Sequence, residues 1–388
     1  MRKVFLRAAV CATAVSGVLL MGAAPVAQDW MGPALQAQVC EAAALKTVTQ
    51  AGKVLPITAV VDPGVPQATK DANGIWTCPT IKQALNKVKN MHVDSAVIQI
   101  QPGTYREKLY IKQPNLTLVG VTSPEYTTIV WDDAEGTPVR PEDLGTTSKK
   151  LYGLSGCPTV KIHEDAVNFQ AVNITFSNDF VPEDHPAMKN RQALAIKNAS
   201  DGSSFYNCRF LGRQDTLYAS DGRQYYKNCY IEGDVDFIFG AGTAVFDTCD
   251  ICSVDRGSDP QGFVTAPSTP ATKHGLLFQH CRLFANFDQG EAYLGRPWHP
   301  SSAKAPVSSE AVFRECEIGS HITSSGWSEM GNKDGVAEPK DNRMFEYKNT
   351  GEGAVKNGDR RQLSDSKAEE YTTKVFFQGW IPDDITVK

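Results

Sequence analysis

The chain has 388 residues, of which 41% are hydrophobic, so it can bury a sizeable core in one large domain or two ordinary ones. Its formal net charge is -5 and it has no basic run, which disfavours a nucleic-acid-binding protein. Beyond the N-terminal segment it has no apolar run long enough to cross a bilayer, which disfavours an integral membrane protein.

The N-terminal segment has the pattern of a secretory signal peptide. The basic residues Arg2, Lys3 and Arg7 precede an apolar run over residues 8–20, and small residues follow that run. We therefore expect residues 1–27 to be removed. The mature protein is expected to be secreted, either to the outside of the cell or, in a Gram-negative bacterium, to the periplasm.

The next part of the chain leads into the first strands. Residues 28–55 contain no motif, and we expect them to form an N-terminal extension. Residues 77–88 combine Pro79 in a first turn with apolar residues at helical spacing, which predicts a short amphipathic helix. Segments 96–111 and 115–121 alternate apolar and polar residues, which predicts strands. A helix just before the first strands would cap the open end of a stack of strands.

A short phrase recurs through the centre of the chain. The phrase consists, in order, of an aromatic residue, one or two others, a cysteine, any residue and a large apolar residue. It occurs around Cys208, Cys229 and Cys249, and again around Cys281 and Cys316. The first three cysteines are 21 and 20 residues apart, a period that is typical of repeat architectures. The residues between them are typical of short strands and turns. The repeat predicts a parallel β-helix with coils of about 21 residues.

The cysteines allow two arrangements. In an exported protein Cys229 and Cys249, at like positions on neighbouring coils, are the best candidates for a disulfide. The alternative is a ladder of small buried thiols that fill the interior of the coils. Cys249 and Cys252 form a CxxC, but in a strand they face opposite sides, so we expect no metal site there.

The same period brings four polar residues together in pairs. Asp215 and Asp236 are 21 residues apart, and Gln192 and Gln214 are 22 apart. Equivalent positions on adjacent coils are about 4.8 Å apart, the spacing of hydrogen-bonded strands. Two carboxyls at that spacing do not both ionise readily, so we expect one of them to keep its proton.

Near the C-terminus, residues 364–375 predict a second short helix, with Ser366 and Glu369 at the spacing of a capping box. This helix would cover the other end of the stack. No break in composition indicates a second domain, so we expect one domain over residues 56–388. The fold expected from these elements is all-β, a parallel β-helix with short helices that cap its ends.

Other catalytic motifs are incomplete. The segment GLSGC around Ser155 lacks the last glycine of a serine-hydrolase elbow, and HExxH is absent. The GAG at residues 240–242 lacks the third glycine of a dinucleotide-binding loop. Asp215 and Asp236 differ from the other aspartates of the repeat because apolar residues follow each of them. A carboxylate in such a place is costly unless it is used or paired.

Several blocks of the chain resemble the signature blocks of the pectin methylesterases, in the order of that family. They are GRQDTLY at residues 212–218, GDVDFIFG at 233–240, LGRPW at 294–298 and QALAI at 192–196. The resemblance extends from about residue 58 to residue 380. It implies a right-handed parallel β-helix, in agreement with the repeat.

The resemblance also implies a role for each matching position. Asp236 matches the nucleophile that attacks the methyl-ester carbonyl of a galacturonate residue. Asp215 matches the general acid that protonates the departing methanol, and Arg296 matches the cation that holds the nucleophile. The remaining matches are the oxyanion donors Gln192 and Gln214, the sugar-subsite aromatics Tyr218 and Trp298, and the groove-wall residues Val235 and Met330.

The family likeness further implies a partner and a cofactor requirement. The substrate would be pectin, a methyl-esterified homogalacturonan, and the products would be methanol and pectate. The chemistry implies no cofactor and no metal. We expect a monomer that binds neither nucleic acid nor membrane.

The block GDVDFIFG departs from the family in one respect. Asp234 stands where the family more often has a small hydroxyl residue. In a regular strand Asp234 and Asp236 would share a face, and the second charge would raise the pKa of the nucleophile. The same wording resembles a lipoprotein branch associated with acyl-CoA thioesterase activity, but that branch lacks the catalytic aspartates.

Three alternatives to the esterase remain on the sequence alone. A depolymerase of the same fold, such as a polygalacturonase, would need a different aspartate cluster and a GHG turn, which is absent. A thioesterase-like relative would act on acyl-CoA rather than on methylated pectin. A carbohydrate-binding β-helix without catalysis would keep its function when Asp236 is replaced.

Overall fold

The computed structural model describes residues 45–141, 150–287, 291–333 and 335–388. The predicted signal peptide, residues 1–27, and the first part of the predicted extension, residues 28–44, lie outside these ranges. Within the described ranges, no helix is both long and apolar enough to cross a membrane.

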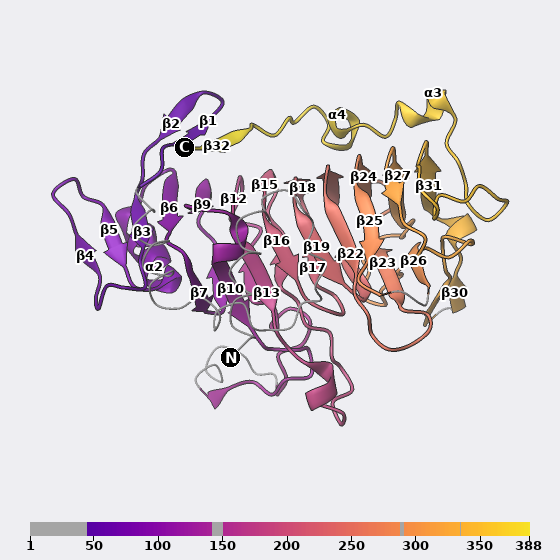
Figure 1. Cartoon of the computed structure of the whole chain (residues 1–388), viewed down its shortest axis with the longest axis horizontal. Helices are drawn as coiled ribbons and strands as arrows, with labels where there is room; N and C mark the ends of the chain where they lie inside the picture. The colour runs from indigo at the N-terminus through magenta and orange to yellow at the C-terminus, as the bar shows by residue number, and fades with distance from the viewer. Residues whose placement is uncertain (1–44, 142–149, 288–290, 334) are drawn as a thin grey trace, which may run out of the picture. The chain divides into compact units, whose positions relative to one another are not determined.

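Three sheets of mainly parallel strands form the body of the protein, and each complete coil of chain gives one strand to each sheet (Figure 1). The eight-stranded sheet contains β7 (Gly103–Arg106), β10 (Thr127–Trp131), β13 (Thr175–Asn178), β16 (Arg209–Leu211), β19 (Tyr230–Gly233), β22 (Asp250–Ser253), β25 (Arg282–Ala285) and β28 (Glu317–Ile318). The seven-stranded sheet contains β8 (Leu109–Ile111), β11 (Val160–Ile162), β14 (Ile196–Asn198), β17 (Leu217–Ala219), β20 (Val235–Gly240), β23 (Gly262–Pro267) and β26 (Ala292–Gly295).

The third sheet has twelve strands. It contains β4 (Thr69–Lys70), β5 (Trp76–Cys78), β3 (Ala59–Val61), β6 (Ala96–Ile100), β9 (Leu116–Gly120), β12 (Gln170–Val172), β15 (Ser203–Tyr206), β18 (Arg223–Lys227), β21 (Thr243–Asp247), β24 (Leu276–Gln279), β27 (Glu310–Arg314) and β31 (Arg343–Tyr347). Apart from the antiparallel pair β4–β5, its neighbours run parallel. The predicted parallel β-helix is therefore confirmed.

Aromatic rings form a continuous stack inside the coils. Phe205, Tyr226, Phe246, Phe278 and Phe313 occupy facing positions on successive strands of the twelve-stranded sheet. Their ring centroids are 4.8, 4.7, 4.6 and 4.4 Å apart, and all five side chains are fully buried. The aromatic residue of the repeated phrase thus supplies the core of each coil.

Replacing Phe246 by alanine should lower the free energy of unfolding by about 3–5 kcal/mol, because the ring has a stacked neighbour on each side and leaves a cavity that rigid strands cannot close. Denaturant unfolding followed by tryptophan fluorescence measures the change. Tyr110→Ala is the control, since that side chain is 50% exposed. A loss below about 1 kcal/mol, the value typical of an average substitution, would show that the stack does not carry the core.

The cysteines of the repeat form a second row beside the aromatic stack. The structure has Cys229 and Cys249 as free, buried thiols and not as a disulfide. Each thiol donates to a main-chain oxygen of the preceding coil, Cys229 to Phe205 at 3.5 Å and Cys249 to Tyr226 at 3.4 Å. The arrangement in the structure is therefore the thiol ladder, the alternative to the disulfide.

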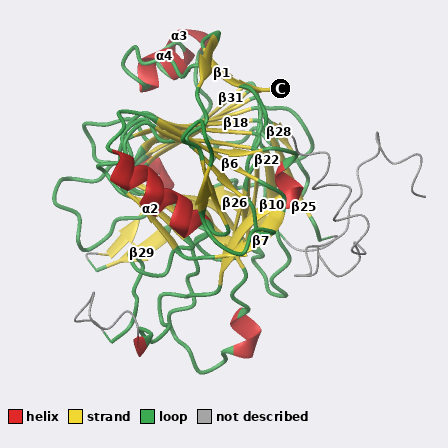
Figure 2. Cartoon of the chain, turned by 90° about the vertical axis from the view of Figure 1, so that its left-hand side faces the viewer, coloured by secondary structure: helices red, strands yellow, loops and turns green. Residues whose placement is uncertain are grey.

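One end of the β-helix is covered by α2 (Ile81–Met91), as predicted (Figure 2). Its N-cap is Thr80, whose hydroxyl accepts from the Gln83 N–H, so Pro79 precedes the helix and is not part of its first turn. The helix buries Ile81 and two further apolar residues in the core that the coils share.

The predicted C-terminal helix is wrong in extent and position. Two one-turn helices form instead, α3 (Asp365–Ala368) with Ser364 as N-cap and α4 (Thr373–Phe376) with Thr372 as N-cap. The segment does not close the far end. It runs back along the outer face of the twelve-stranded sheet, as Figure 1 shows in yellow, because Phe376 and other apolar residues pack on an apolar row of that face.

The chain ends in a small antiparallel sheet. It consists of β2 (Lys53–Leu55), β1 (Val48–Gln50) and β32 (Ile385–Val387), so the last residues of the predicted extension are strands. A two-stranded sheet, β29 (Met330–Asn332) and β30 (Gly335–Ala337), lies outside the three large sheets. The remaining short elements are the 3-10 turns η1 (Pro124–Tyr126), η3 (Pro182–Asp184) and η4 (Pro339–Asp341).

Candidate active site

Asp215 and Asp236 lie at matching positions on two neighbouring coils. Asp215 comes just before β17 and Asp236 lies in β20, and Leu217 pairs with Ile238 in these adjacent strands. The Asp215 N–H donates to the Val235 carbonyl at 3.0 Å. At the usual strand spacing of about 4.8 Å, this register brings the two aspartates together.

Both aspartates depart from regular strand conformation. Their φ angles are +67° at Asp215 and +52° at Asp236, in the left-handed region that residues other than glycine seldom adopt. The pairing of β20 with β23 also shifts register between Val235 and Ile238. Such irregularities re-aim side chains at sites. Here Asp236 is placed beside an arginine while the next residue, Phe237, is buried in the core.

Arg296 clamps Asp236 with two hydrogen bonds. Its Nε and one terminal nitrogen donate to the two carboxylate oxygens at 2.8 and 2.7 Å. Arg296 follows β26, and its own N–H donates to the Thr265 carbonyl, which fixes the start of the side chain. The guanidinium also lies 3.9 Å from the ring centre of Phe263. Bidentate pairs of this kind hold both the charge and the orientation of a carboxylate.

The environment separates the two carboxyls in acidity. Burial raises the pKa of Asp215 well above its usual range, and the charge of Asp236 raises it further. Burial also raises the pKa of Asp236, but the hydrogen bonds and charge of Arg296 oppose that rise. The exposed fractions are 8% and 6%, so burial alone does not distinguish them. We therefore expect Asp236 to ionise first and Asp215 to retain the proton.

Asp215→Asn should stabilise the fold increasingly as the pH rises. The folded pKa of Asp215 lies above the unfolded value, so its contribution to stability is present at low pH and is lost as the pH rises through that interval. Each unit of the difference corresponds to about 1.4 kcal/mol at neutral pH. Thermal unfolding from pH 4 to 8 should show that the Tm of the variant, relative to that of the wild type, increases with pH. Parallel curves would contradict the raised pKa of Asp215.

The two predicted amides also lie on adjacent coils. Gln192 and Gln214 are half-buried, and the Ala193 N–H donates to the Gln214 carbonyl at 3.1 Å. Within the described part of the chain, the Gln192 Oε1 atom is buried and has no hydrogen-bond partner. A buried polar atom of this kind is costly unless a ligand or water satisfies it.

Aromatic residues line one side of the site. Tyr218, two residues after Thr216 and three after Asp215, stacks on Phe239 with ring centres 4.3 Å apart. Trp298 packs edge-on against Tyr218, with ring centres 6.5 Å apart, and is tilted against Phe239 at 5.8 Å. Tyr218 and Trp298 are partly exposed, and they form one face with the buried Phe239.

The strand pairing places Val235 near the aspartates but does not place Met330 there; both are predicted residues of the groove wall. Val235 is half-buried between Asp234 and Asp236, so the register of β20 holds it beside the aspartates. Met330 begins β29, and the pairing of that hairpin is with β30 and not with the strands that carry the aspartates. The role of Met330 stays a prediction.

The expectation for Asp234 needs correction. The register shift in β20 breaks the alternation on which the expectation depended. Asp234 instead forms an ion pair with Arg213 at 3.1 Å, and its charge raises the pKa of Asp215. The second negative charge therefore strengthens the difference between the two catalytic candidates.

Two further residues contribute charge that sequence reasoning missed. Glu135, in the loop after β10, raises the pKa of Asp215, and its N–H donates to the Gln192 carbonyl at 2.8 Å. Arg256, in the loop after β22, lowers the pKa of Asp236. Both belong to loops between strands, where neither spacing nor periodicity gives a signal.

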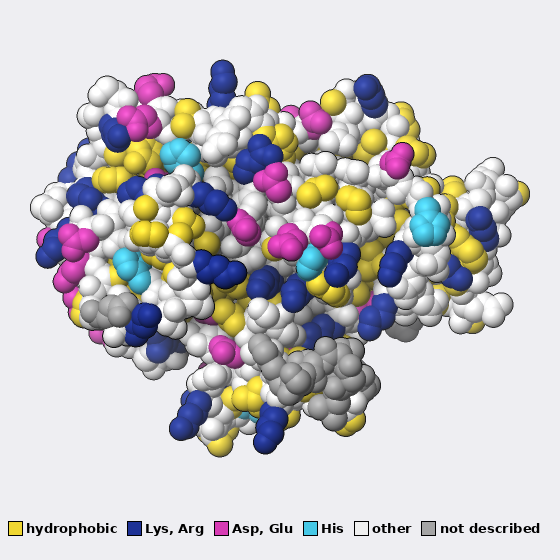
Figure 3. All heavy atoms as spheres, turned by 180° about the vertical axis from the view of Figure 1, so that it is seen from behind, with side chains coloured by type: hydrophobic (Ala, Val, Ile, Leu, Met, Phe, Trp, Pro, Cys, Tyr) yellow, Lys and Arg dark blue, Asp and Glu magenta, His cyan; other side chains and the backbone are white. Residues whose placement is uncertain are grey.

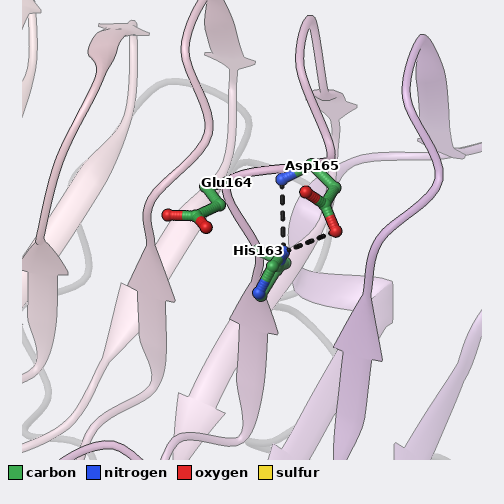
Figure 4. A group of neighbouring side chains, drawn as sticks. All are labelled: His163, Glu164 and Asp165. Atoms are coloured by element: carbon green, nitrogen blue, oxygen red, sulfur yellow. Dashed lines mark hydrogen bonds and ion pairs between the residues drawn. The ribbon is translucent and has the colours of Figure 1, made fainter.

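One group of side chains has the spacing of metal ligands but lies elsewhere. Figure 4 shows His163, Glu164 and Asp165 in the turn after β11, with ligand atoms within 4.8 Å of one another. His163 Nδ1 already accepts from the Asp165 N–H, and Lys112 lies 4.0 Å from the Asp165 carboxylate. Local contacts account for this turn, and it adds nothing to the aspartate site.

Comparison with known proteins relates this chain to pectinesterases. The model of the pectinesterase family matches residues 67–380. Pectinesterase 31 of Arabidopsis thaliana is 33% identical over 80% of this chain and 91% of its own length, and pectinesterase A of Dickeya chrysanthemi is 36% identical over 74% and 83%. The structure of pectin methylesterase PemA from Erwinia chrysanthemi matches with a TM-score of 0.74 at 33% identity, over 84% of this chain and 99% of that one.

Proposed function

The chain belongs to the pectinesterase family, and on that premise we propose how its two buried aspartates hydrolyse the methyl esters of pectin. The enzyme is a carboxylic ester hydrolase that releases methanol and leaves pectate. One observation carries the proposal: Arg296 holds the carboxylate of Asp236 with two short hydrogen bonds, beside Asp215, whose pKa burial raises well above its usual range.

In the first step Asp236 forms an acyl-enzyme. One carboxylate oxygen attacks the ester carbonyl carbon, and the carbonyl π electrons move to oxygen. When the C–O bond to the methoxy group breaks, Asp215 gives its proton to that oxygen and methanol leaves. The products of this step are methanol, a mixed anhydride on Asp236 and an ionised Asp215. Arg296 keeps the nucleophile charged and oriented before attack.

In the second step water cleaves the anhydride. The ionised Asp215 takes a proton from a water molecule while the oxygen of that water attacks the galacturonate carbonyl carbon. The bond to Asp236 then breaks, which restores its carboxylate, and Asp215 is protonated again. The galacturonic acid product loses its own proton to solvent. The resulting anion lies near Asp236, Asp234 and Glu135, and repulsion among these charges favours its release.

The remaining residues bind and orient the substrate. The side-chain amides of Gln192 and Gln214 stabilise the oxyanion of the tetrahedral intermediates. Tyr218 and Trp298 offer partly exposed aromatic faces to the sugar rings. We assign Val235 and Met330 to the wall of the substrate groove. In oxyanion stabilisation the NH2 group of each amide donates, and the unpartnered amide oxygen of Gln192 is free to accept from a hydroxyl of the bound sugar.

We also propose a setting for the enzyme. It is secreted after removal of residues 1–27, and residues 56–388 act as one domain and as a monomer. It binds neither nucleic acid nor membrane. The pI of about 5.9 disfavours binding to nucleic acid or to an acidic membrane surface, and Figure 3 shows acidic and basic side chains interspersed over one face of the protein.

The test is methanol release from highly methylated pectin by the purified protein, with polymer length measured in parallel. We expect methanol at a rate proportional to enzyme and an unchanged length. Shortening of the polymer would indicate a depolymerase. Hydrolysis of acyl-CoA without methanol release would indicate the thioesterase-like alternative, and no turnover of either substrate would contradict the enzyme assignment.

A further inference from the structure

An ion pair between the half-buried Arg213 and the buried Asp234 joins the two turns that carry the aspartates. Arg213 Nε lies 3.1 Å from Asp234 Oδ2, with side-chain exposures of 29% and 9%. Arg213 is two residues before Asp215, and Asp234 is two residues before Asp236. Arg213 and Asp234 are therefore 21 residues apart, as the two aspartates are, and they lie two residues earlier in their coils.

Main-chain hydrogen bonds connect the same two turns. The Asp234 N–H donates to the Arg213 carbonyl at 3.2 Å, and the Asp215 N–H donates to the Val235 carbonyl at 3.0 Å. Asp234 Oδ1 accepts from the Val235 N–H at 2.6 Å, while Oδ2 makes the 3.1 Å ion-pair contact with Arg213 Nε, whose geometry is not that of a hydrogen bond. The contacts between the coils therefore continue up to each aspartate.

The aspartates need such support because their backbone is strained. A non-glycine residue in the left-handed region costs about 1–2 kcal/mol, and both aspartates adopt it. The register shift after Val235 removes regular ladder hydrogen bonds from this part of β20. Contacts outside the regular ladder must therefore hold the two carboxyls at their relative positions.

We propose that the Arg213–Asp234 ion pair is a clamp between coils that positions Asp215 and Asp236 for reaction. The clamp residues act through the aspartates and are positioning residues. The inference rests on the proposed function, because it concerns the geometry of those two carboxyls.

The clamp has an electrostatic consequence as well. Burial raises the pKa of Asp215 most, the charges of Asp236, Glu135 and Asp234 raise it further, and the charge of Arg296 lowers it. Removing the charge of Asp234 should therefore let Asp215 lose its proton at a lower pH. The charged groups around the clamp itself are Arg256, which lowers the pKa of Asp234, and Glu183, 3.9 Å from Arg213.

A double-mutant cycle tests the clamp in the full-length protein. Asp234→Asn keeps an oxygen for the Val235 N–H and removes the charge, and Arg213→Met keeps the aliphatic stem. We expect each variant to lose about 10- to 100-fold in kcat, the scale of a displacement near 1 Å, with little change in KM. The double variant should lose no more than either single one, because both remove the same contact.

The control is an exposed ion pair of the same kind. Asp250 and Arg282 also join neighbouring coils, at 2.9 Å, with exposures of 44% and 45%. Asp250→Asn and Arg282→Met should retain the wild-type kcat within about twofold, since exposed pairs contribute little. Thermal unfolding of all variants establishes that they are folded. If Asp234→Asn does not fold, Asp234→Ser, with a smaller oxygen donor and acceptor, replaces it in the cycle.

The pH profile separates positioning from general stability. In Asp234→Asn the alkaline limb of kcat/KM should move to lower pH, which a purely structural loss would not produce. A variant with wild-type kcat and pH profile would overturn the clamp, as would single losses that multiply in the double variant. Wild-type methanol release is measured first, so failure of the proposed function shows in the wild type, whereas failure of the clamp shows only in the variants.

Discussion

Asp236→Ala will lower the rate of methanol release by at least about 10³-fold, the usual scale for loss of a covalent nucleophile. Alanine leaves Arg296 without its two acceptors and leaves the ester carbonyl without an attacking oxygen. Asp215 alone can supply a proton but cannot form the acyl-enzyme. Methanol release under saturating methylated pectin, with the binding of pectin measured separately, gives the loss in kcat.

Asp250→Ala is the matched control for this loss, because Asp250 also pairs with an arginine of the next coil but is exposed. Its activity should equal that of the wild type. If Asp236→Ala retained more than about a tenth of the rate, direct attack of water on the ester would replace the acyl-enzyme mechanism.

Arg296→Met should lower kcat by about 10²-fold or more at neutral pH, comparable to loss of a preorganised electrostatic contact. Burial raises the pKa of Asp236, and in the wild type Arg296 opposes that rise. Without the guanidinium the nucleophile keeps its proton to a higher pH. The acid limb of the pH–rate profile should therefore move to higher pH, and part of the lost rate should return as the pH rises.

Arg296→Lys separates charge from geometry. Lysine keeps the positive charge but cannot make two parallel hydrogen bonds to one carboxylate. We expect its acid limb to stay closer to that of the wild type while kcat remains low. If the acid limb of the pH–rate profile does not move in Arg296→Met, the role of Arg296 in ionising Asp236 is contradicted.

Most of the fold could be predicted from the repeat in the sequence. The spacing of the repeated cysteines predicts the coil, and the structure adds that Phe205, Tyr226 and Phe246 stack in register to form its core. The next facing residues, Phe278 and Phe313, follow at intervals of 32 and 35, because longer loops interrupt the later coils. The period alone could not set that register.

The same period placed Asp215 beside Asp236 but could not supply their surroundings. Arg296 reaches Asp236 from two strands further along the seven-stranded sheet, and only the likeness to a family indicated it. Glu135 and Arg256 act from loops whose path no periodicity describes. Arg213 was within reach of sequence reasoning, because its offset of 21 from Asp234 is that of the aspartates themselves.

Local conformation accounts for the errors. Asp234 and Asp236 would share a face in a regular strand. Asp236 itself has a left-handed backbone, however, and the strand register shifts between Val235 and Ile238. The C-terminal segment has helical composition, yet it forms only two single turns because its apolar residues spread along a sheet face and do not gather on one side of a helix. Tertiary packing decided both outcomes.

The ionisation order of the two carboxyls can be measured by carbon-13 NMR of protein labelled at the aspartate side-chain carboxyls. Asp215→Asn and Asp236→Asn identify the two signals, and a pH titration of the free enzyme follows each one. We predict that Asp236 loses its proton first and that Asp215 remains protonated over the pH range of catalysis. Ionisation of Asp215 before Asp236, or of both together near the ordinary aspartate value, would contradict the mechanism.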